Sequence, residues 1–140
     1  TDLETVKPKV KEVFQANRVY VFLMPAANGV CQSQKLLALI DGKLTDAVTK
    51  IKAVGLDASA IETKMATAKT DATAAYTAYL LVLNNPGGGD AVNKAKMAEA
   101  KTSMQAVRKA LGDIKSDIGN LIGDYRKKIK ANADATVPPE

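Results

Sequence analysis

MAEAKTSMQAVRKALGDIKSDIGNLIGDY, residues 97–125, is the stretch that decides the fold. Its apolar side chains recur at alternating steps of three and four residues through about four heptads, which is typical of a helix that buries one seam. The positions are Met97, Ala100, Met104, Val107, Leu111, Ile114, Ile118, Leu121 and Tyr125. Asp90 follows a glycine run and can cap this helix, so we predict a helix over 91–130, about 60 Å long at roughly 1.5 Å per residue.

Two amphipathic segments lie directly upstream of this helix. Residues 58–83 repeat the helical spacing, with Asp57 as a candidate N-cap and the Asn-Asn-Pro-Gly-Gly-Gly run at 84–89 as a stop. Residues 30–54 carry another apolar seam, which ends at Gly55. Glycine is favoured immediately after a helix, so this segment is predicted to be helical up to that residue.

The first segment completes the predicted architecture. Its helix starts near Lys7 and ends before Pro25, because the residue preceding a proline is pushed out of the α region. Four amphipathic helices with short loops predict an all-α fold, an antiparallel up-down-up-down four-helix bundle with a long C-terminal helix. We expect one domain over 1–130 and a disordered, Pro-containing tail or linker at 131–140.

Two alternatives to this architecture remain open. The first is a three-helix core with a loosely attached first segment. The second places a β-hairpin at Asp41-Gly42, between LLALI and KLTDAV, because Asp-Gly is a strong hairpin signal. The helical spacing after Gly42 favours the helix.

Composition argues against most catalytic chemistry. The chain has 140 residues, 46% of them hydrophobic and only 4% aromatic, so its core must be aliphatic. It has no histidine, the side chain most used for acid–base catalysis near neutral pH and the commonest metal ligand. Cys31 is the single cysteine and has no histidine to activate it. We therefore expect no enzyme activity, no metal and no cofactor, and the role and exposure of Cys31 stay open.

The predicted bundle brings two loops together at one end. In an up-and-down arrangement, MPAANG at 24–29 and NNPGGG at 84–89 become neighbours. We call the resulting candidate partner-binding surface the tip, because functional groups often lie on loops held by a rigid scaffold. Its residues are Tyr20, Asn28, Gly29, Tyr79, Asn85, Gly87, Gly88 and Gly89. The alternative interpretation is two helix stops with core aromatic residues beneath them.

The opposite end of the predicted bundle gathers cationic side chains into a basic pole. Its residues are Lys7, Lys11, Lys52, Arg126, Lys127 and Lys128. Such a pole suits nucleic acid, an anionic surface or an acidic partner. The net charge is only +5 and no aromatic residues are interleaved for base stacking, so nucleic acid is an unlikely partner and ordinary complementarity to helix dipoles accounts for the charges equally well.

Small residues form a stripe beside the seam of the last helix. The members are Gly112, Ser116, Gly119 and Gly123. Each interior glycine costs about 1 kcal/mol relative to alanine, so we expect a second helix to pack closely there. That neighbour is either the first helix of the same chain or a second molecule. A threonine stripe on the preceding helix, Thr63, Thr67, Thr70 and Thr77, is interpreted as ordinary surface.

Three segments carry a resemblance to a known group of proteins. They are RVYVF (18–22) leading to Pro25, KLTDAVTKIKAVGLDASAIETKMATAKTDATAA (43–75) and NKAKMAEAKTSMQAVRKALGDIKSDIGNLI (93–122). Over roughly 18–126 the chain resembles uncharacterised exported α-helical proteins with Ala/Lys/Asp-rich bundles. The resemblance implies an exported location, often with a linker or membrane anchor after the bundle, and it supplies no activity. The triple-glycine loop and Cys31 depart from the pattern.

These observations favour a non-catalytic protein. We expect a secreted or cell-surface helical bundle that acts as a protein-interaction module or structural spacer, with an extracellular or cell-surface location. The start at Thr1 and the final ATVPPE favour a piece of an exported protein, with possible membrane anchoring outside this chain. The alternative is an intracellular adaptor, or a protein that binds nucleic acid or an anionic surface through the basic pole. The partner is an unknown protein or surface, and the chain is expected to be a monomer or a weak homo-oligomer.

Overall fold

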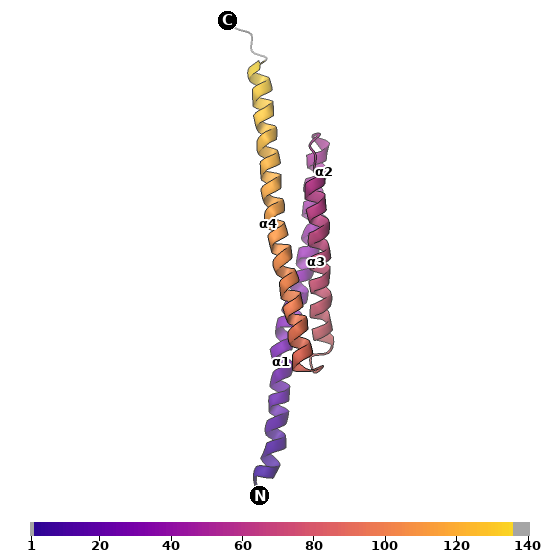
Figure 1. Cartoon of the computed structure of the whole chain (residues 1–140), viewed down its shortest axis with the longest axis vertical. Coiled ribbons are helices and arrows are strands. Elements are labelled where there is room, and N and C mark those ends of the chain that lie inside the picture. The colour runs from indigo at the N-terminus through magenta and orange to yellow at the C-terminus, as the bar shows by residue number, and fades with distance from the viewer. Residues whose placement is uncertain (1, 136–140) are drawn as a thin grey trace.

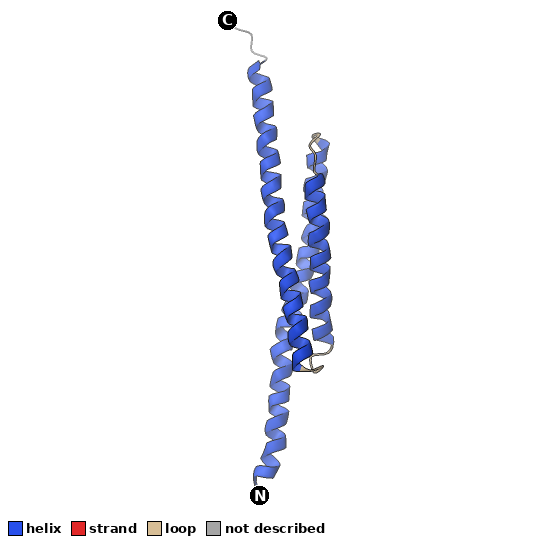
Figure 2. Cartoon of the chain, viewed as in Figure 1, coloured by secondary structure: helices blue, strands red, loops and turns tan. Residues whose placement is uncertain are grey.

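The computed structural model describes residues 2–135, and it describes their side chains except at 2–5, 15, 18, 134 and 135. Helix α1 (Asp2–Leu39) continues through the π-helical segment η1 (Ile40–Leu44) into α2 (Thr45–Ala53). Helix α3 (Ser59–Asn84) then runs back, and α4 (Asp90–Ala135) runs forward again (Figure 1). Every described element is helical and no strand occurs among them (Figure 2). The all-α prediction is confirmed, but the helices form three long rods instead of the four predicted.

The predicted corner at Pro25 is wrong, because α1 passes through this residue as a helix. An interior proline removes a backbone hydrogen bond and costs about 3 kcal/mol. Packing on either side of it offsets that cost. Phe22 and Ala26 are buried against Val82 of α3, with Met97 of α4 packed beside them. Burial of a large apolar side chain contributes about 1.5 to 3 kcal/mol, so this cluster holds the helix together across the proline.

The neighbouring Asn28-Gly29 pair, which looked like a loop signal, also lies inside α1. Gly29 is buried, and a Cβ built on it would lie 2.6 Å from three ring carbons of Tyr79 in α3. The glycine is therefore explained by the close approach of an aromatic ring. No turn is required at this position.

The segment around Asp41-Gly42 is a single π-helical turn, so the β-hairpin alternative is wrong. Ile40 at its start is buried with 2% of its surface exposed. The Thr45 hydroxyl donates to the Ile40 carbonyl at 3.0 Å, across the wide turn. Lys69 of α3 pairs with Asp41 at 2.7 Å and ties this turn to its neighbour.

The turn between α2 and α3 follows the sequence prediction closely. Gly55 adopts a left-handed conformation with φ +78°, and its amide donates to the Lys52 carbonyl at 2.9 Å. The Asp57 carboxylate accepts the Ser59 amide at 2.9 Å, which satisfies one of the free amides at the start of α3. The predicted C-terminal glycine is confirmed. The N-cap residue is Ala58 and not Asp57, which lies one residue earlier and bonds the first helical amide from there.

The core forms where α3 lies against both of its neighbours. Helix α3 packs extensively on α1 and on α4, whereas α1 and α4 meet at few positions. One cluster, near the α2–α3 turn, contains Val48, Ile51, Ala58, Ile61 and Ile114, and the other contains Phe22, Ala26 and Val82. Between them α3 buries four alanines, Ala68, Ala72, Ala75 and Ala78. Such small side chains allow neighbouring helix axes to approach closely.

Two helical ends extend beyond this core, at opposite ends of the molecule (Figure 1). We call residues 2–21 of α1 the N-terminal overhang and residues 125–135 of α4 the C-terminal overhang. A long C-terminal helix was predicted. Helix α4 reaches Ala135, past the predicted end at Lys130, and the remaining tail residues 136–140 lie outside the described part of the chain. None of the described helices is both long enough and apolar enough to cross a bilayer.

Candidate functional site

The loop of the predicted tip is held down by a buried asparagine that the sequence analysis missed. Asn93, 3% exposed, donates its side-chain amide to the carbonyls of Pro86 at 2.8 Å and Asn85 at 3.3 Å. Its backbone amide donates to the Gly89 carbonyl at 3.0 Å. Asn93 lies four residues before Met97 in the α4 seam, so continuing the apolar spacing one step upstream identifies it as a buried polar position.

The three glycines of this loop have different surroundings. Gly89 has φ +109°, a conformation that side chains rarely adopt. A Cβ on Gly88 would collide with the Asn85 side chain, whereas one on Gly87 would meet open space. The loop is thus shaped by backbone requirements at two of its three glycines.

The other half of the tip is the side of a helix, which corrects the predicted loop at 24–29. Phe22 and Ala26 pack beside Val82, so this part of α1 does lie at the loop end of α3. Gly29 lies directly beneath the Tyr79 ring, so it is buried and unavailable to a partner. Asn28 and Tyr20 are exposed on α1. The structure therefore brings these segments together and leaves only part of the tip accessible.

The predicted basic pole is divided between the two ends of the molecule. Lys7 and Lys11 belong to the N-terminal overhang, while Arg126, Lys127 and Lys128 belong to the C-terminal overhang. Lys52 lies in the last turn of α2 and pairs with Glu62 at 2.5 Å. Because α1 does not turn at Pro25, about 65 Å of continuous helix separates Lys7 from Lys52 at roughly 1.5 Å per residue. The six residues do not form one surface.

The small-residue stripe of α4 faces away from the other described helices. A Cβ built on Gly112, Gly119 or Gly123 meets no atom within 4 Å, and Ser116 is exposed. The predicted close approach of the first helix of the same chain is wrong at these positions. The reason is again α1, which runs through Pro25 as one helix, so that no separate first helix folds back against this stripe.

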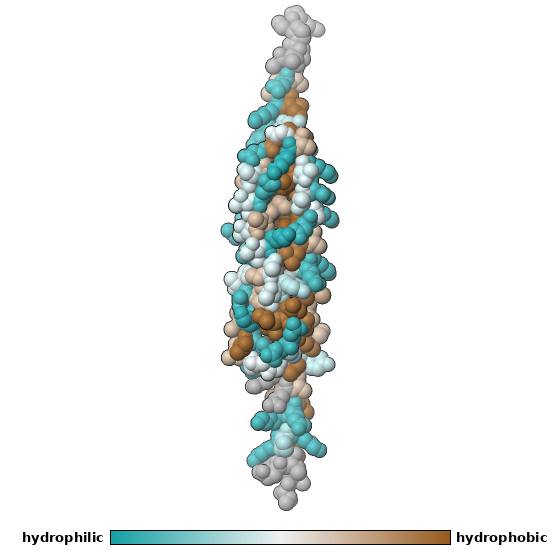
Figure 3. Space-filling model, turned by 90° about the vertical axis from the view of Figure 1, so that its right-hand side faces the viewer, coloured by the Kyte–Doolittle hydropathy of each residue, from teal (hydrophilic) through white to brown (hydrophobic). Residues whose placement is uncertain are grey.

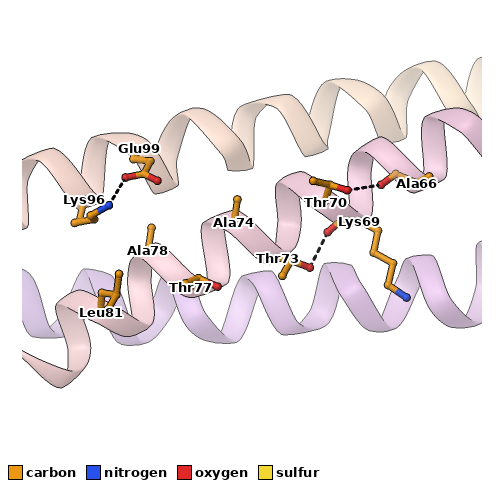
Figure 4. Close-up of a pocket in the computed structure, with 10 residues that line it drawn as sticks. All are labelled: Ala66, Lys69, Thr70, Thr73, Ala74, Thr77, Ala78, Leu81, Lys96 and Glu99. Carbon is orange, nitrogen blue, oxygen red and sulfur yellow. Dashed lines mark hydrogen bonds and ion pairs between the residues drawn. The ribbon is translucent and has the colours of Figure 1, made fainter.

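A groove runs between α3 and the start of α4, with a volume of about 680 Å³ (Figure 4). It is lined by Ala66, Lys69, Thr70, Thr73, Ala74, Thr77, Ala78, Leu81, Lys96 and Glu99. The Thr70 and Thr73 hydroxyls donate to backbone carbonyls four residues earlier, at 3.1 and 2.8 Å. Lys96 and Glu99 pair at 2.7 Å on the α4 side. The groove therefore offers apolar side chains and charged groups that are already paired, Lys96 with Glu99 and Lys69 with Asp41.

The charged groups with shifted pKa values lie at the other end of α3. The pKa of Lys64 is raised because its ammonium donates to Asp117 of α4 at 2.5 Å. The pKa of the Asp57 carboxyl is lowered because it accepts the hydrogen bond from the Ser59 amide. Both groups have partners that explain their shifts, so neither suggests acid–base chemistry. Among the residues described, no three His, Cys, Asp or Glu side chains are placed to hold a metal ion.

The most extensive apolar feature lies on the first half of α1. Seven large apolar side chains are exposed there: Val6, Val10, Val13, Phe14, Tyr20, Val21 and Met24. As the first helix of the predicted four-helix bundle, most of this segment would have one face covered by its neighbours. In the structure α3 and α4 end before they reach the N-terminal overhang, so the side chains that lie in it have no described helix beside them (Figure 1). Cys31 is also exposed, further along the same helix.

The rest of the surface is mixed in character. On the side of the molecule shown in Figure 3, apolar patches on the body are separated by hydrophilic side chains.

The chain matches no protein-family model, no curated protein and no solved structure. The resemblance to exported helical proteins therefore stays a prediction, and the function must be argued from the geometry.

Proposed function

We propose that this protein is a non-catalytic helical spacer with one attachment surface at each end. The observation that carries the proposal is the stagger of its helices. The N-terminal overhang leaves the body at one end and the C-terminal overhang leaves it at the other (Figure 1). Each end is a single helix with apolar side chains exposed, such as Phe14 on α1 and Ile129 on α4. Isolated helical arms of this kind gain stability when a partner covers them.

The continuity of the first helix gives the spacer its length. Residues 2–53 form an unbroken helical run of roughly 80 Å at about 1.5 Å per residue. Asp57 and Asp124 line one groove, so α4 passes the α2–α3 turn near Asp124 and continues for about eleven residues more. The described chain is therefore on the order of 95 Å long. A four-helix bundle built on the predicted last helix would be about 60 Å long.

The character of the body also supports a non-catalytic role. The chain has no histidine, and the groove between α3 and α4 is lined by alanines, by threonines and by a paired Lys96–Glu99. The Thr70 and Thr73 hydroxyls are bonded to backbone carbonyls, and the one carboxylate of the lining is held in the ion pair. Methyl-lined grooves suit helix packing better than turnover of a small molecule.

The separation of the basic residues favours the spacer over the alternative function. Nucleic-acid binding through one pole requires several cations on one surface, because each neutralised phosphate adds to affinity. Lys7 and Lys11 lie at the opposite end from Arg126, Lys127 and Lys128. The exported location, and membrane anchoring outside this chain, remain predictions.

Photo-crosslinking tests the two-ended arrangement. The photoreactive residue p-benzoylphenylalanine replaces Phe14 in the N-terminal overhang, Ile129 in the C-terminal overhang, or Ala106, an exposed control in the body. Each full-length variant is irradiated in extract from the cells that make the protein. We expect specific adducts from positions 14 and 129 and none from 106. Adducts from 106 alone would overturn the proposal.

A further inference from the structure

Four heptads of seam positions run along the outer face of α1. Val10, Asn17, Met24 and Cys31 lie seven residues apart, and Val6, Val13, Tyr20 and Ala27 form the second series. Together they alternate steps of three and four residues, the a and d spacing of a coiled coil. We call this set the outer seam. It is distinct from the α1 face that packs on α3 and α4, which contains Phe22, Ala26 and Ser33.

The outer seam is open to solvent in the described chain. Its large apolar members are 46–68% exposed, and Asn17 and Cys31 are exposed as well. Met24 lies two residues beyond the buried Phe22, a rotation of about 200° around the helix. The seam therefore points away from the body, and its members are exposed except for Ala27, which is half-buried.

The composition of the overhang indicates that this face is covered in the working protein. Residues 6–21 contain five valines and an interior proline, which are weak helix formers. A single helix of this length and composition is marginal in water without packing along one side. Figure 1 shows no other described helix beside it.

We propose that a second copy of this chain covers the outer seam, with α1 pairing against α1 in parallel and in register. This inference rests on the proposed function, since it names the partner of the N-terminal overhang. The first support is area. The five large apolar members of the outer seam, together with Phe14 and Val21 beside it, offer on the order of 700 Å² per copy, close to the roughly 800 Å² per partner of a standard interface.

The second support is Asn17, the one polar member inside the apolar part of the seam. In a parallel, in-register pair its side chain faces Asn17 of the other copy, and the two amides satisfy each other. A single asparagine at such a position fixes the register and the number of strands. An unrelated apolar partner would leave this amide without a hydrogen bond, which disfavours it.

The third support is the shape of the surface around Val10. A depression of about 220 Å³ is lined by Lys9, Val10, Val13 and Phe14. In parallel pairing, the Val10 and Val13 side chains of the second copy insert at these positions as knobs into holes. Lys9 then lies across from Phe14 of the other copy, where its ammonium can pack on the ring.

Cys31 reports on the register. It continues the Val10–Asn17–Met24 series, so parallel in-register pairing places the two Cys31 thiols opposite each other. Antiparallel pairing separates them along the molecule. A disulfide between the two copies is thus expected only for the proposed orientation.

Sedimentation analysis of the reduced full-length chain measures the pairing, and we expect twice the 14.8 kDa chain mass. Val13→Glu places two unpaired carboxylates in the seam and is expected to weaken dimerisation by about a hundredfold or more. Tyr20→Glu should act in the same way. Ala106→Glu adds the same charge at an exposed position on α4 and should leave the dimer intact.

Diamide then tests the orientation. Two Cys31 thiols form one S–S bond, and their two hydrogens pass to the azo bond of diamide, which becomes a hydrazine. We expect a covalent dimer in the wild-type chain and none in Val13→Glu or Cys31→Ser, although Cys31→Ser still dimerises. A dimer that does not cross-link through Cys31 overturns the parallel register. A chain that stays monomeric up to about 100 µM overturns the pairing itself.

Small-angle scattering separates this inference from the proposed function. Monomeric Val13→Glu should retain a maximum dimension on the order of 95 Å. If the wild-type chain is monomeric but equally long, the pairing fails and the spacer stands. A dimension near 60 Å contradicts the spacer whatever the oligomeric state.

Discussion

Replacing Gly29 by alanine tests whether α1 passes through Pro25 as a packed helix. Gly29 lies in the middle of α1, where a Cβ would be 2.6 Å from three ring carbons of Tyr79. Gly112 is the matched control, because it is also inside a long helix but faces open space. The two substitutions therefore make the same chemical change in opposite packing environments.

The expected magnitudes have opposite signs. Gly112→Ala should stabilise the protein by about 0.5 to 1 kcal/mol, the gain in helix propensity and in the conformational entropy of unfolding. Gly29→Ala gains the same amount, but its methyl group would lie about 1 Å inside normal contact with Tyr79. Forcing an extra methyl group into a packed interface costs about 1 to 3 kcal/mol. We expect a net destabilisation of about 1 kcal/mol.

Urea unfolding followed by far-UV circular dichroism measures both variants. All chains are compared at one protein concentration, because any self-association makes stability concentration-dependent. With a slope of about 2 kcal/mol per molar urea, Gly29→Ala should lower the midpoint by about 0.5 M. Gly112→Ala should raise it by up to about 0.5 M.

A double-mutant cycle identifies the ring as the cause. In a Tyr79→Ala background the space above Gly29 is empty, so Gly29→Ala should become stabilising, with a coupling of about 2 kcal/mol between the two sites. If Gly29→Ala stabilises the wild-type chain as much as Gly112→Ala does, Tyr79 does not lie over Gly29. The packing of Tyr79 would then not explain the glycine inside an unbroken α1.

Three other predictions concern the core and the turns. Ile114→Ala should lower the free energy of unfolding, measured by urea denaturation, by about 2 to 5 kcal/mol. Ile129→Ala on the exposed C-terminal overhang should change this free energy by less than about 0.5 kcal/mol in a monomeric background. Asn93→Ala removes the side-chain donor to two loop carbonyls, so it should lower the free energy of unfolding by about 1 to 2 kcal/mol. It should also speed amide hydrogen exchange at residues 87–89, and unchanged exchange there would contradict the anchoring role of Asn93. The pKa of the Asp57 carboxyl is lowered in the folded state. Its contribution to stability is therefore present above the unfolded-state pKa and is lost as pH falls through the folded-state pKa. An NMR titration of Asp57 in the folded protein should give a midpoint below the ordinary aspartate value.

The sequence predicted α3, α4 and the turn before α3 because local and tertiary signals agree there. The α4 positions Met104, Val107 and Ile114 are buried as the heptad spacing indicated, and Gly55 ends its helix in the expected conformation. Periodicity is informative where one face of a helix is covered along its whole length. This condition holds for nearly all of α3 and for α4 up to the α2–α3 turn.

Local signals in the sequence could not show that α1 continues through Pro25 without a corner. Proline and the Asn28-Gly29 pair favour a break, and they were outweighed by burial of Phe22 and Ala26 and by the approach of Tyr79. These contacts depend on where α3 lies and are not visible in the spacing of α1. This error also joined the basic residues into one pole and made the N-terminal segment a fourth helix of the bundle.

The exposed valines show a second limit of sequence patterns. An apolar seam predicts that a helix face is covered, but it does not say which partner covers it. Val6, Val10 and Val13 have the spacing of core residues, and α3 and α4 end before they reach them. Helix lengths, which depend on loop positions, decide which part of a seam is buried within the chain.

The distance between the ends of the first helical run tests the central claim most directly. Lys7→Cys and Lys52→Cys are spin-labelled in a Cys31→Ser, Val13→Glu background, which leaves two labels on a monomeric chain. Double electron–electron resonance should give a separation of about 65 to 70 Å between the two spin labels, the length of continuous helix between these residues. A corner at Pro25 would return Lys7 to the end of the bundle that holds Lys52. A separation of about 10 to 20 Å, the spacing of neighbouring helices, would contradict the extended architecture and the function argued from it.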